Sequence, residues 1–411
     1  MLATSATATI AASASSSNAA ASLHDSRSTS NFVRDMTVGR RLKQHEAYDS
    51  RGSLKFHADK RDYDVPRYKC VALPEATGMS SNVPSATKCP PGKVPAALLH
   101  VQTRTEPTFQ YFYDGLDLDS AYLQKTGIVE PALSHVWIEL AARCCKRPRA
   151  HVVDVGANFG WYTLLSLALG CHVIAFEPIP TYANILALGL RRNPGFAART
   201  TLHRAVVAEE AGRNFTVKVP IANPLSGWLK HLGMTSMVGE HGLIKGFPDN
   251  WMHFNVSSPS VRVDDVVPPD VPVCMLKADV EGYEPAVLRT AERLLSSGRV
   301  HAVQLEVTTS PDRRVASETV EALAHLETLG FTVRQLPRRM DNNGSATFDS
   351  LPAFPSARAV AGCKKARSPL AGTPLAETPF GRAYHCDINT FSTNLVARHR
   401  QHHGRNASSV R

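Results

Sequence analysis

The stretch HVVDVGANFGWYT, residues 151–163, decides the fold of this chain. A short apolar run reaches Asp154 and then a turn bracketed by Gly156 and Gly160, which is typical of a buried parallel strand that ends in a tight turn. Glycine at such a turn adopts positive φ and lets a ligand approach the backbone. An apolar helix follows the turn, and a second apolar run ends at Glu177. The unit predicts a nucleotide-binding strand–helix–strand layout.

The residues of the turn distinguish between two cofactors. A dinucleotide fingerprint needs a second glycine for close approach of the pyrophosphate, and Asn158 stands in its place. A carboxylate at Asp154 disfavours a pyrophosphate and favours a cationic group, such as the amino-acid end of S-adenosylmethionine. Glu177 ends the second strand, where a carboxylate can hold both hydroxyls of a ribose. We therefore expect S-adenosylmethionine rather than a nicotinamide dinucleotide or a turn without a ligand.

Three motifs resemble the FkbM family of S-adenosylmethionine-dependent methyltransferases. They are DVGAN at residues 154–158 with Gly160, Tyr162 and Thr163 behind it, AFEP at residues 175–178, and LKADVEGYE at residues 276–284. The third looks like the family's Lys-x-Asp-x-Glu-Gly-x-Glu signature and is the most specific. The resemblance extends over about residues 116–396. It implies a doubly wound, Rossmann-like α/β methyltransferase sheet with helices on both faces.

The resemblance and the turn together predict where the cofactor binds. The cofactor-binding residues follow the ends of the first three strands and of the signature strand: Asp154, Gly156, Ala157, Asn158, Phe159, Gly160, Tyr162, Thr163, Glu177, Pro178, Ala205, Val206 and Asp279. In the resemblance, Ala205 and Val206 are the nearest candidates for contact with the adenine ring. The turn at residues 127–130 resembles a segment that lies over the cofactor as a partial lid.

The signature also predicts the catalytic residues Lys277, Asp279 and Glu281. Along an extended chain, Lys277 and Glu281 are expected to share one face and Asp279 to take the other. Asp279 is the predicted base that accepts the proton of an acceptor hydroxyl. Crowding by Glu281 and Glu306 is expected to raise its pKa. The alternative role for Asp279 is to position the amino group of the cofactor.

The expected reaction is O-methylation of a hydroxyl on a small-molecule or glycan acceptor: a sugar, glycan, lipid or secondary metabolite. The alternatives are a nicotinamide-dependent Rossmann oxidoreductase and an RNA methyltransferase, the latter because the formal charge is +10. The basic residues are scattered and no RNP-type aromatic motif is present, so nucleic acid is not an expected partner. No metal is assigned, although Asp264, Asp265 and Asp279 offer oxygen ligands for a divalent ion. The oligomeric state is left open.

Composition divides the 411 residues into four parts. The first 24 residues carry no Asp, Glu, Lys or Arg, and arginines follow, which is typical of an organelle transit peptide (plastid or mitochondrion) or of a disordered leader in a cytoplasmic protein. No run of 18 apolar residues exists, so no transmembrane helix is predicted. The parts are a leader at 1–63, an N-terminal wrap and helical lid segment at 64–150, the methyltransferase domain at 151–397 with an irregular insertion at 338–384, and a basic tail at 398–411.

Periodicity predicts the remaining elements, and the cysteines add one candidate cross-link. Strands are expected at 109–113, 201–207, 215–219, 261–263, 300–307 and 331–336, and helices at 118–146, 181–192, 319–329 and from residue 285. Residues 387–395 resemble the final strand of the FkbM family. The eight cysteines contain no C-x-x-C pair, which argues against a zinc site. Cys171 and Cys274 are expected to be small core residues, and Cys70 with Cys89 is a candidate disulfide in an oxidising compartment.

Overall fold

The structure is a computed structural model, and only part of the chain is described below. The described residues are 69–72, 93–96, 98–114, 117, 120–222, 236–237, 252–307, 312–336, 346–355, 368–386 and 393–402. The chain divides into Met1–Pro66 and Arg67–Arg411, and every described residue belongs to the second unit. The predicted leader, Cys89, residues 387–392 and the end of the basic tail lie outside the described residues.

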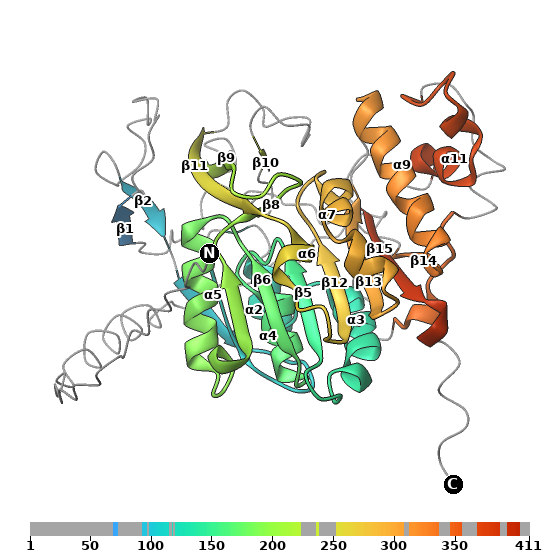
Figure 1. Cartoon of the computed structure of the whole chain (residues 1–411). Helices are drawn as coiled ribbons and strands as arrows, with labels where there is room; N and C mark the ends of the chain where they lie inside the picture. Colours follow the sequence, from blue (N-terminus) through green and yellow to red (C-terminus); the bar gives the residue numbers. More distant parts are fainter. Residues whose placement is uncertain are drawn as a thin grey trace, which may run out of the picture. The chain divides into compact units, whose positions relative to one another are not determined.

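Seven strands form the central sheet in the order β14-β15-β13-β12-β5-β6-β7 (Figure 1). Their bounds are β5 His151–Val155, β6 His172–Phe176, β7 Thr200–His203, β12 Val273–Ala278, β13 Val300–Val307, β14 Phe331–Leu336 and β15 Thr393–His399. The strands from β7 to β13 are parallel, and β15 lies antiparallel between β13 and β14. The chain order reverses between β5 and β12, which is the topological switch point where such sheets bind ligands. The predicted doubly wound α/β sheet is confirmed.

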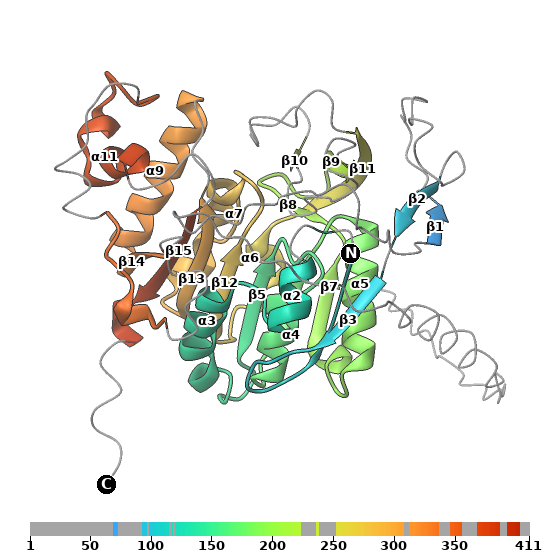
Figure 2. The ribbon, with the colours of Figure 1, turned by 180° about the vertical axis from the view of Figure 1, so that it is seen from behind.

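Helices cover both faces of this sheet, as the two opposite views show (Figures 1 and 2). On one face lie α2 Ser120–Thr126, α3 Pro131–Cys144, α4 Trp161–Ala168 and α5 Pro180–Arg192, and on the other α6 Val263–Val266, α7 Glu284–Thr290, α8 Glu292–Ser296, α9 Arg313–Thr328 and α11 Pro379–Cys386. Val152 belongs to the first core and its neighbour Val153 to the second. Because successive side chains of a strand point to opposite faces, a strand covered on both faces is apolar throughout, which explains the run before Asp154.

Four strands form a smaller sheet in the order β10-β9-β11-β8. Their bounds are β8 Val206–Val207, β9 Asn214–Ala222, β10 Ser236–Met237 and β11 Met252–Val261. The strand predicted at 201–207 is therefore two strands, and β8 pairs with β11 rather than with the central sheet. The strand predicted at 261–263 is wrong, because β11 ends at Val261 and α6 begins at Val263.

The segment before the central sheet begins with two hairpins and two helices. β1 Lys69–Ala72 pairs with β2 Lys93–Ala96, and β3 Leu98–Gln102 pairs with β4 Gln110–Asp114, so the aromatic strand predicted at 109–113 is confirmed. The single helix predicted at 118–146 is instead α2 and α3, because Gly127 with a φ of 68° interrupts it. Short 3-10 helices lie at η1 Ala197–Arg199, η4 Phe348–Ser350, η5 Pro374–Glu377 and η6 Arg400–His402.

The insertion at 338–384 was expected to be irregular, and its described part corrects this. Phe380 and Tyr384 of α11 are 3% and 0% exposed and belong to the same core as α9. Two or three apolar anchors suffice to hold a short helix against a longer one, and so short a segment shows little periodicity. None of the described helices is long and apolar enough to cross a membrane.

Two disulfides lie inside the first core. Cys144 at the end of α3 bonds to Cys274 of β12, and Cys145 bonds to Cys171 before β6. Cys171 and Cys274 are fully buried, as expected, but they are cross-linked rather than free. Disulfide partners must bring their Cα atoms within about 7 Å, and that proximity is set by the fold rather than by sequence spacing. The pairing of Cys70 with Cys89 stays a prediction.

Candidate active site

The glycine turn between β5 and α4 is shaped by its contacts with two other elements. Gly156 has a φ of 78°, and a Cβ there would meet the carbonyl oxygen of Asp279 at 1.9 Å. Gly160 has a φ of 89°, and a Cβ there would meet Leu186 Cδ1 of α5 at 2.2 Å. Any side chain at either position would therefore clash, apart from its backbone strain. The turn is held directly against the end of β12, across the switch point.

A buried lysine joins the two strands at that point. Lys277 is 3% exposed, and its Nζ lies 3.0 Å from Asp279 Oδ2 and 3.7 Å from Asp154 Oδ1. The same ammonium donates a hydrogen bond of 3.0 Å to the carbonyl of Gly156. Thr163 donates at 2.6 Å to the other oxygen of Asp154, which is fully buried. Burial alone would lower the pKa of Lys277, but the charges of Asp279 and Asp154 outweigh it and raise that pKa.

The predicted arrangement of the signature side chains is wrong. Lys277 and Asp279 were expected on opposite faces, yet their charged groups are in contact. Residues two apart in an extended strand share a face, so Lys277 and Asp279 point to the same side of β12. Asp154 is paired with Lys277 in the register of β5 and β12, which places all three groups on that side. The correct geometry follows from the strand period itself.

Asp279, Glu281 and Glu306 form a second group, which we name the rim acids. One carboxylate oxygen of each lies within 4.8 Å of the others. Burial opposes ionisation of Asp279, but the charge of Lys277 and hydrogen bonds with Glu306 and Lys277 lower its pKa. The predicted rise is therefore wrong for Asp279. It applies to Glu281 instead, where burial and then the charges of Asp279 and Glu284 raise the pKa well above its usual value.

Glu177 organises the glycine turn from the end of β6. Its two oxygens accept the N–H groups of Asn158 at 2.7 Å and Ile179 at 2.9 Å. Asn158 has a φ of 52°, a conformation that asparagine tolerates better than most residues. Burial raises the pKa of Glu177 to about 7. The carboxylate thus supports the loop, and its contact with a ribose stays a prediction.

Besides Asp154 Oδ1, which faces Lys277, three buried polar atoms near this turn have no hydrogen-bond partner among the described residues. They are the side-chain oxygen of Asn158, the hydroxyl of Tyr182 and Nε2 of His203. Asn158 follows β5, Tyr182 lies in the first turn of α5 after β6, and His203 ends β7. The three residues thus belong to the segments at the carboxyl ends of three neighbouring strands. Unsatisfied groups of this kind are costly unless a ligand or water completes them. Their donor and acceptor chemistry fits the nucleoside part of a cofactor.

Comparison with known proteins identifies the domain that holds this site. The family model described as the methyltransferase FkbM domain matches residues 154–333, from the acid of the turn to β14. This is an FkbM methyltransferase domain. Among proteins of curated function, none matches the chain.

Several solved structures resemble the chain at low identity. A precorrin-6y C5,15-methyltransferase from Geobacter metallireducens is 14% identical and covers 50% of this chain and 72% of its own, with a TM-score of 0.26. A SAM-dependent O-methyltransferase from Thermotoga maritima is 12% identical and covers 73% of this chain and 77% of its own, with a TM-score of 0.28. The plantazolicin methyltransferase BpumL in complex with SAH is 8% identical and covers 69% of this chain and 89% of its own, with a TM-score of 0.26. None of these likenesses bears on the residues of the site.

Residues outside the matched range also reach the site of the FkbM domain. Tyr162 donates at 2.7 Å to Glu130 Oε2, and its ring lies 5.7 Å from Lys277 Nζ. Glu130 caps α3 with a φ of 42°, and Asn394 of β15 donates to its other oxygen at 3.4 Å. The turn at 127–130 was singled out by resemblance, but neither Glu130 nor Asn394 was predicted as a site residue. Only the antiparallel insertion of β15 beside β13 brings Asn394 there.

The other predicted residues take supporting places. Phe159 packs on Tyr182 with ring centroids 5.1 Å apart, and the remaining apolar cofactor residues Ala157, Ala205 and Val206 are buried, with Pro178 half-buried. Of the acids considered as metal ligands, Asp264 accepts the N–H groups of Arg293 and Leu294 and so caps α8. Asp264 therefore has a structural role at the start of α8.

Proposed function

We propose that the FkbM domain transfers the methyl group of S-adenosylmethionine to a hydroxyl oxygen of a small-molecule or glycan acceptor. The observation that carries the proposal is the group of rim acids, which meets the glycine turn across the switch point. When bound, S-adenosylmethionine supplies an electrophilic methyl group. An alcohol is too weak an acid to attack unaided, so a carboxylate within reach of its proton is the protein's contribution.

The residues that would hold the cofactor divide by the chemistry they offer. Asn158, Tyr182 and His203 present the unpaired polar atoms suited to the nucleoside. Glu177 lies between them at the end of β6, where its remaining lone pairs can accept ribose hydroxyls. Asp279 keeps a low pKa and a 30% exposed side chain, which suits a permanent anion facing the cationic end of the cofactor.

Glu281 is the better proton acceptor of the signature. A general base is most effective when its pKa lies near the working pH. The lowered pKa of Asp279 makes that carboxylate a weak base, whereas the raised pKa of Glu281 strengthens its carboxylate. Glu281 also has a φ of 58°, one of four positive φ values among described residues other than glycine. Such conformations concentrate at functional sites. We therefore assign the proton transfer to Glu281 and charge stabilisation to Asp279.

Calorimetry tests the cofactor assignment directly. The full chain is expected to bind S-adenosylmethionine and its demethylated product, and not NAD. Glu177→Ala should cost on the order of 2 to 4 kcal/mol of binding, because charge-assisted hydrogen bonds are lost. Glu292→Ala, on an exposed α8 glutamate, is the matched control. Tight binding of NAD without binding of S-adenosylmethionine would refute the assignment.

Labelled methyl transfer tests the reaction. Isotopically labelled cofactor is incubated with extracts of the source organism and the protein, and the product is characterised by mass spectrometry. A labelled methyl ether on a hydroxylated product is the expected result. Label found only on nitrogen, carbon or nucleic acid would contradict O-methylation while leaving the cofactor assignment intact.

A further inference from the structure

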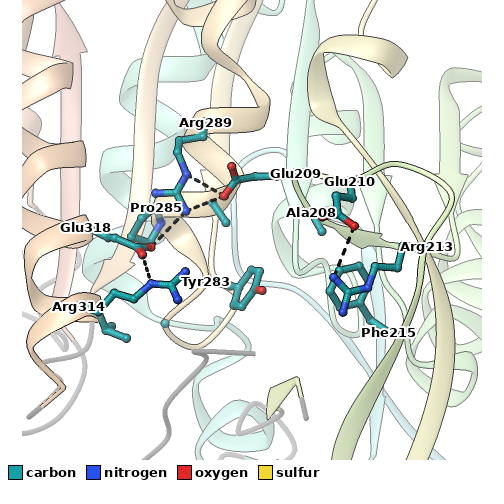
Figure 3. Close-up of a pocket in the computed structure, with 13 residues that line it drawn as sticks. Ala208, Glu209, Glu210, Arg213, Phe215, Tyr283, Pro285, Arg289, Arg314 and Glu318 are labelled. Carbon is teal, nitrogen blue, oxygen red and sulfur yellow. Dashed lines mark hydrogen bonds and ion pairs between the residues drawn. The ribbon is translucent and has the colours of Figure 1, made fainter. Parts of the chain in front are cut away.

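A cavity of about 210 Å³ lies on the α7 and α9 side of the sheet (Figure 3). Three segments line it: the loop after β8 with the start of β9, residues 282–289 before and within α7, and the first turns of α9. Its wall begins at Gly282, the residue directly after Glu281. Gly282 and Tyr283 directly follow the assigned proton acceptor in the chain, so the cavity wall continues the loop that carries Glu281. Neither the sequence pattern nor the cofactor site accounts for the cavity.

The charged side chains of the cavity cancel and are tied together. Arg289 contacts Glu209 at 2.7 Å and Glu318 at 3.1 Å, and Arg314 contacts Glu318 at 2.7 Å. Arg213 and Glu210 are 3.5 Å apart. Three arginines and three glutamates leave no net charge, so the cavity favours neither a phosphate nor a cation.

This network nevertheless offers hydrogen bonds of both kinds. In Figure 3 the guanidinium of Arg289 reaches toward both Glu209 and Glu318. Its side chain is 42% exposed and that of Glu318 is 24% exposed, so both are accessible to a ligand. Next to each other, a planar guanidinium donates to one hydroxyl of a ligand and a carboxylate accepts from the neighbouring hydroxyl. Little reorganisation is needed because the ion pairs already hold the side chains.

Apolar surface completes the cavity. Phe215, Pro285 and Val315 line it together with the ring of Tyr283, which Figure 3 shows between the Arg314–Glu318 pair and Phe215. A sugar ring combines apolar C–H faces with a rim of hydroxyls that both donate and accept. The volume equals about seven molecules of liquid water, which is room for one ring rather than an extended glycan.

We propose that this cavity binds a neutral sugar ring of the acceptor. The inference rests on the proposed function, since the methyl-accepting hydroxyl would belong to that sugar or to the unit attached to it. An anionic sugar is disfavoured because the arginines are already neutralised by glutamates. A planar aromatic acceptor would leave the hydrogen-bonding groups of the network unused.

Ligand-detected NMR tests the proposal on the full chain with S-adenosylhomocysteine bound. The probes are methyl glycosides of glucose, galactose and mannose, with glucose 6-phosphate and glucuronic acid as charged counterparts. At least one neutral glycoside should show saturation transfer, and Arg289→Leu should weaken its binding about 10- to 100-fold through loss of charged hydrogen bonds. Arg293→Leu, on an ion-paired arginine of α8 outside the cavity, should leave glycoside binding unchanged.

The outcomes separate the two levels of inference. Failure of S-adenosylhomocysteine to bind wild type overturns the proposed function. Normal binding of that product with no response from any neutral glycoside overturns the sugar cavity alone. Preference for the charged sugars, or glycoside binding that survives in Arg289→Leu, also overturns it. Arg314→Leu supplies a second test of the network if Arg289→Leu does not fold, and product binding in each variant reports an intact cofactor site.

Discussion

Replacing Lys277 by methionine should destabilise the domain strongly and in a pH-dependent way. The ammonium lies 3.0 Å from Asp279 and 3.7 Å from Asp154 in a site that is almost inaccessible to water. At an effective dielectric constant of about 20, Coulomb's law assigns roughly 4 to 6 kcal/mol to each contact. Burying the ammonium costs part of this, and removal of one partner of a buried ion pair typically costs about 3 to 5 kcal/mol. We expect a loss in that range at neutral pH.

The pH dependence follows from the carboxylate that Lys277→Met leaves behind. Burial already raises the pKa of Asp154 against the charge of Lys277, and loss of that charge raises it further. When the pKa of a carboxyl is higher in the folded than in the unfolded state, its full contribution to the stability of the folded state is present at pH values below the pKa of the unfolded state. This contribution is lost as the pH rises through the pKa of the folded state. The deficit of the variant should therefore be small near pH 4 and largest above pH 7.

Urea unfolding of wild type and Lys277→Met at several pH values measures the effect. Lys146→Met, on an exposed lysine after α3, controls for the loss of one positive charge. Adding Asp154→Asn to Lys277→Met should recover part of the stability, because it removes the unpaired charge. A loss below about 1 kcal/mol at pH 8, or one that does not change with pH, would refute the view that Lys277 neutralises a buried acid.

Three further outcomes are expected. Glu281→Gln should lower turnover roughly 100- to 10,000-fold and leave cofactor affinity nearly unchanged, whereas Asp279→Asn should lower both turnover and cofactor affinity. Single-turnover kinetics measures the first quantity and calorimetry the second. A loss of turnover without loss of affinity in Asp279→Asn, and not in Glu281→Gln, would instead make Asp279 the base. The Cys144–Cys274 and Cys145–Cys171 disulfides link residues 130 and 26 positions apart, and reduction of each should lower the free energy of unfolding by about 3 to 5 kcal/mol. An unchanged melting temperature in reductant would contradict their formation. Burial raises the pKa of Glu284 to about 7, so the free energy of unfolding of wild type should fall by about 3 kcal/mol as the pH rises from 4 to 8. That of Glu284→Gln should fall by less. Parallel pH profiles of stability in the two proteins would count against this shift.

Much of the central fold can be predicted from the chain because its signals are local. The alternating burial of Val152 and Val153, the glycine turn and the apolar helix after it are all determined within thirteen residues. The acid at the end of β6 is equally local. Such patterns report the period of a strand or helix and the backbone conformations that only glycine adopts easily, and both are properties of neighbouring residues.

The tertiary structure alone decided which of these groups meet. Asp154 and Lys277 are separated by more than a hundred residues and face each other only because β5 and β12 adjoin at the switch point. The same applies to Asn394 beside Glu130 and to the two disulfides. The contrasting pKa values of Asp279 and Glu281 depend on which of them contacts the ammonium. Periodicity along a chain carries no information on strand order, and electrostatics depend on distances that strand order creates.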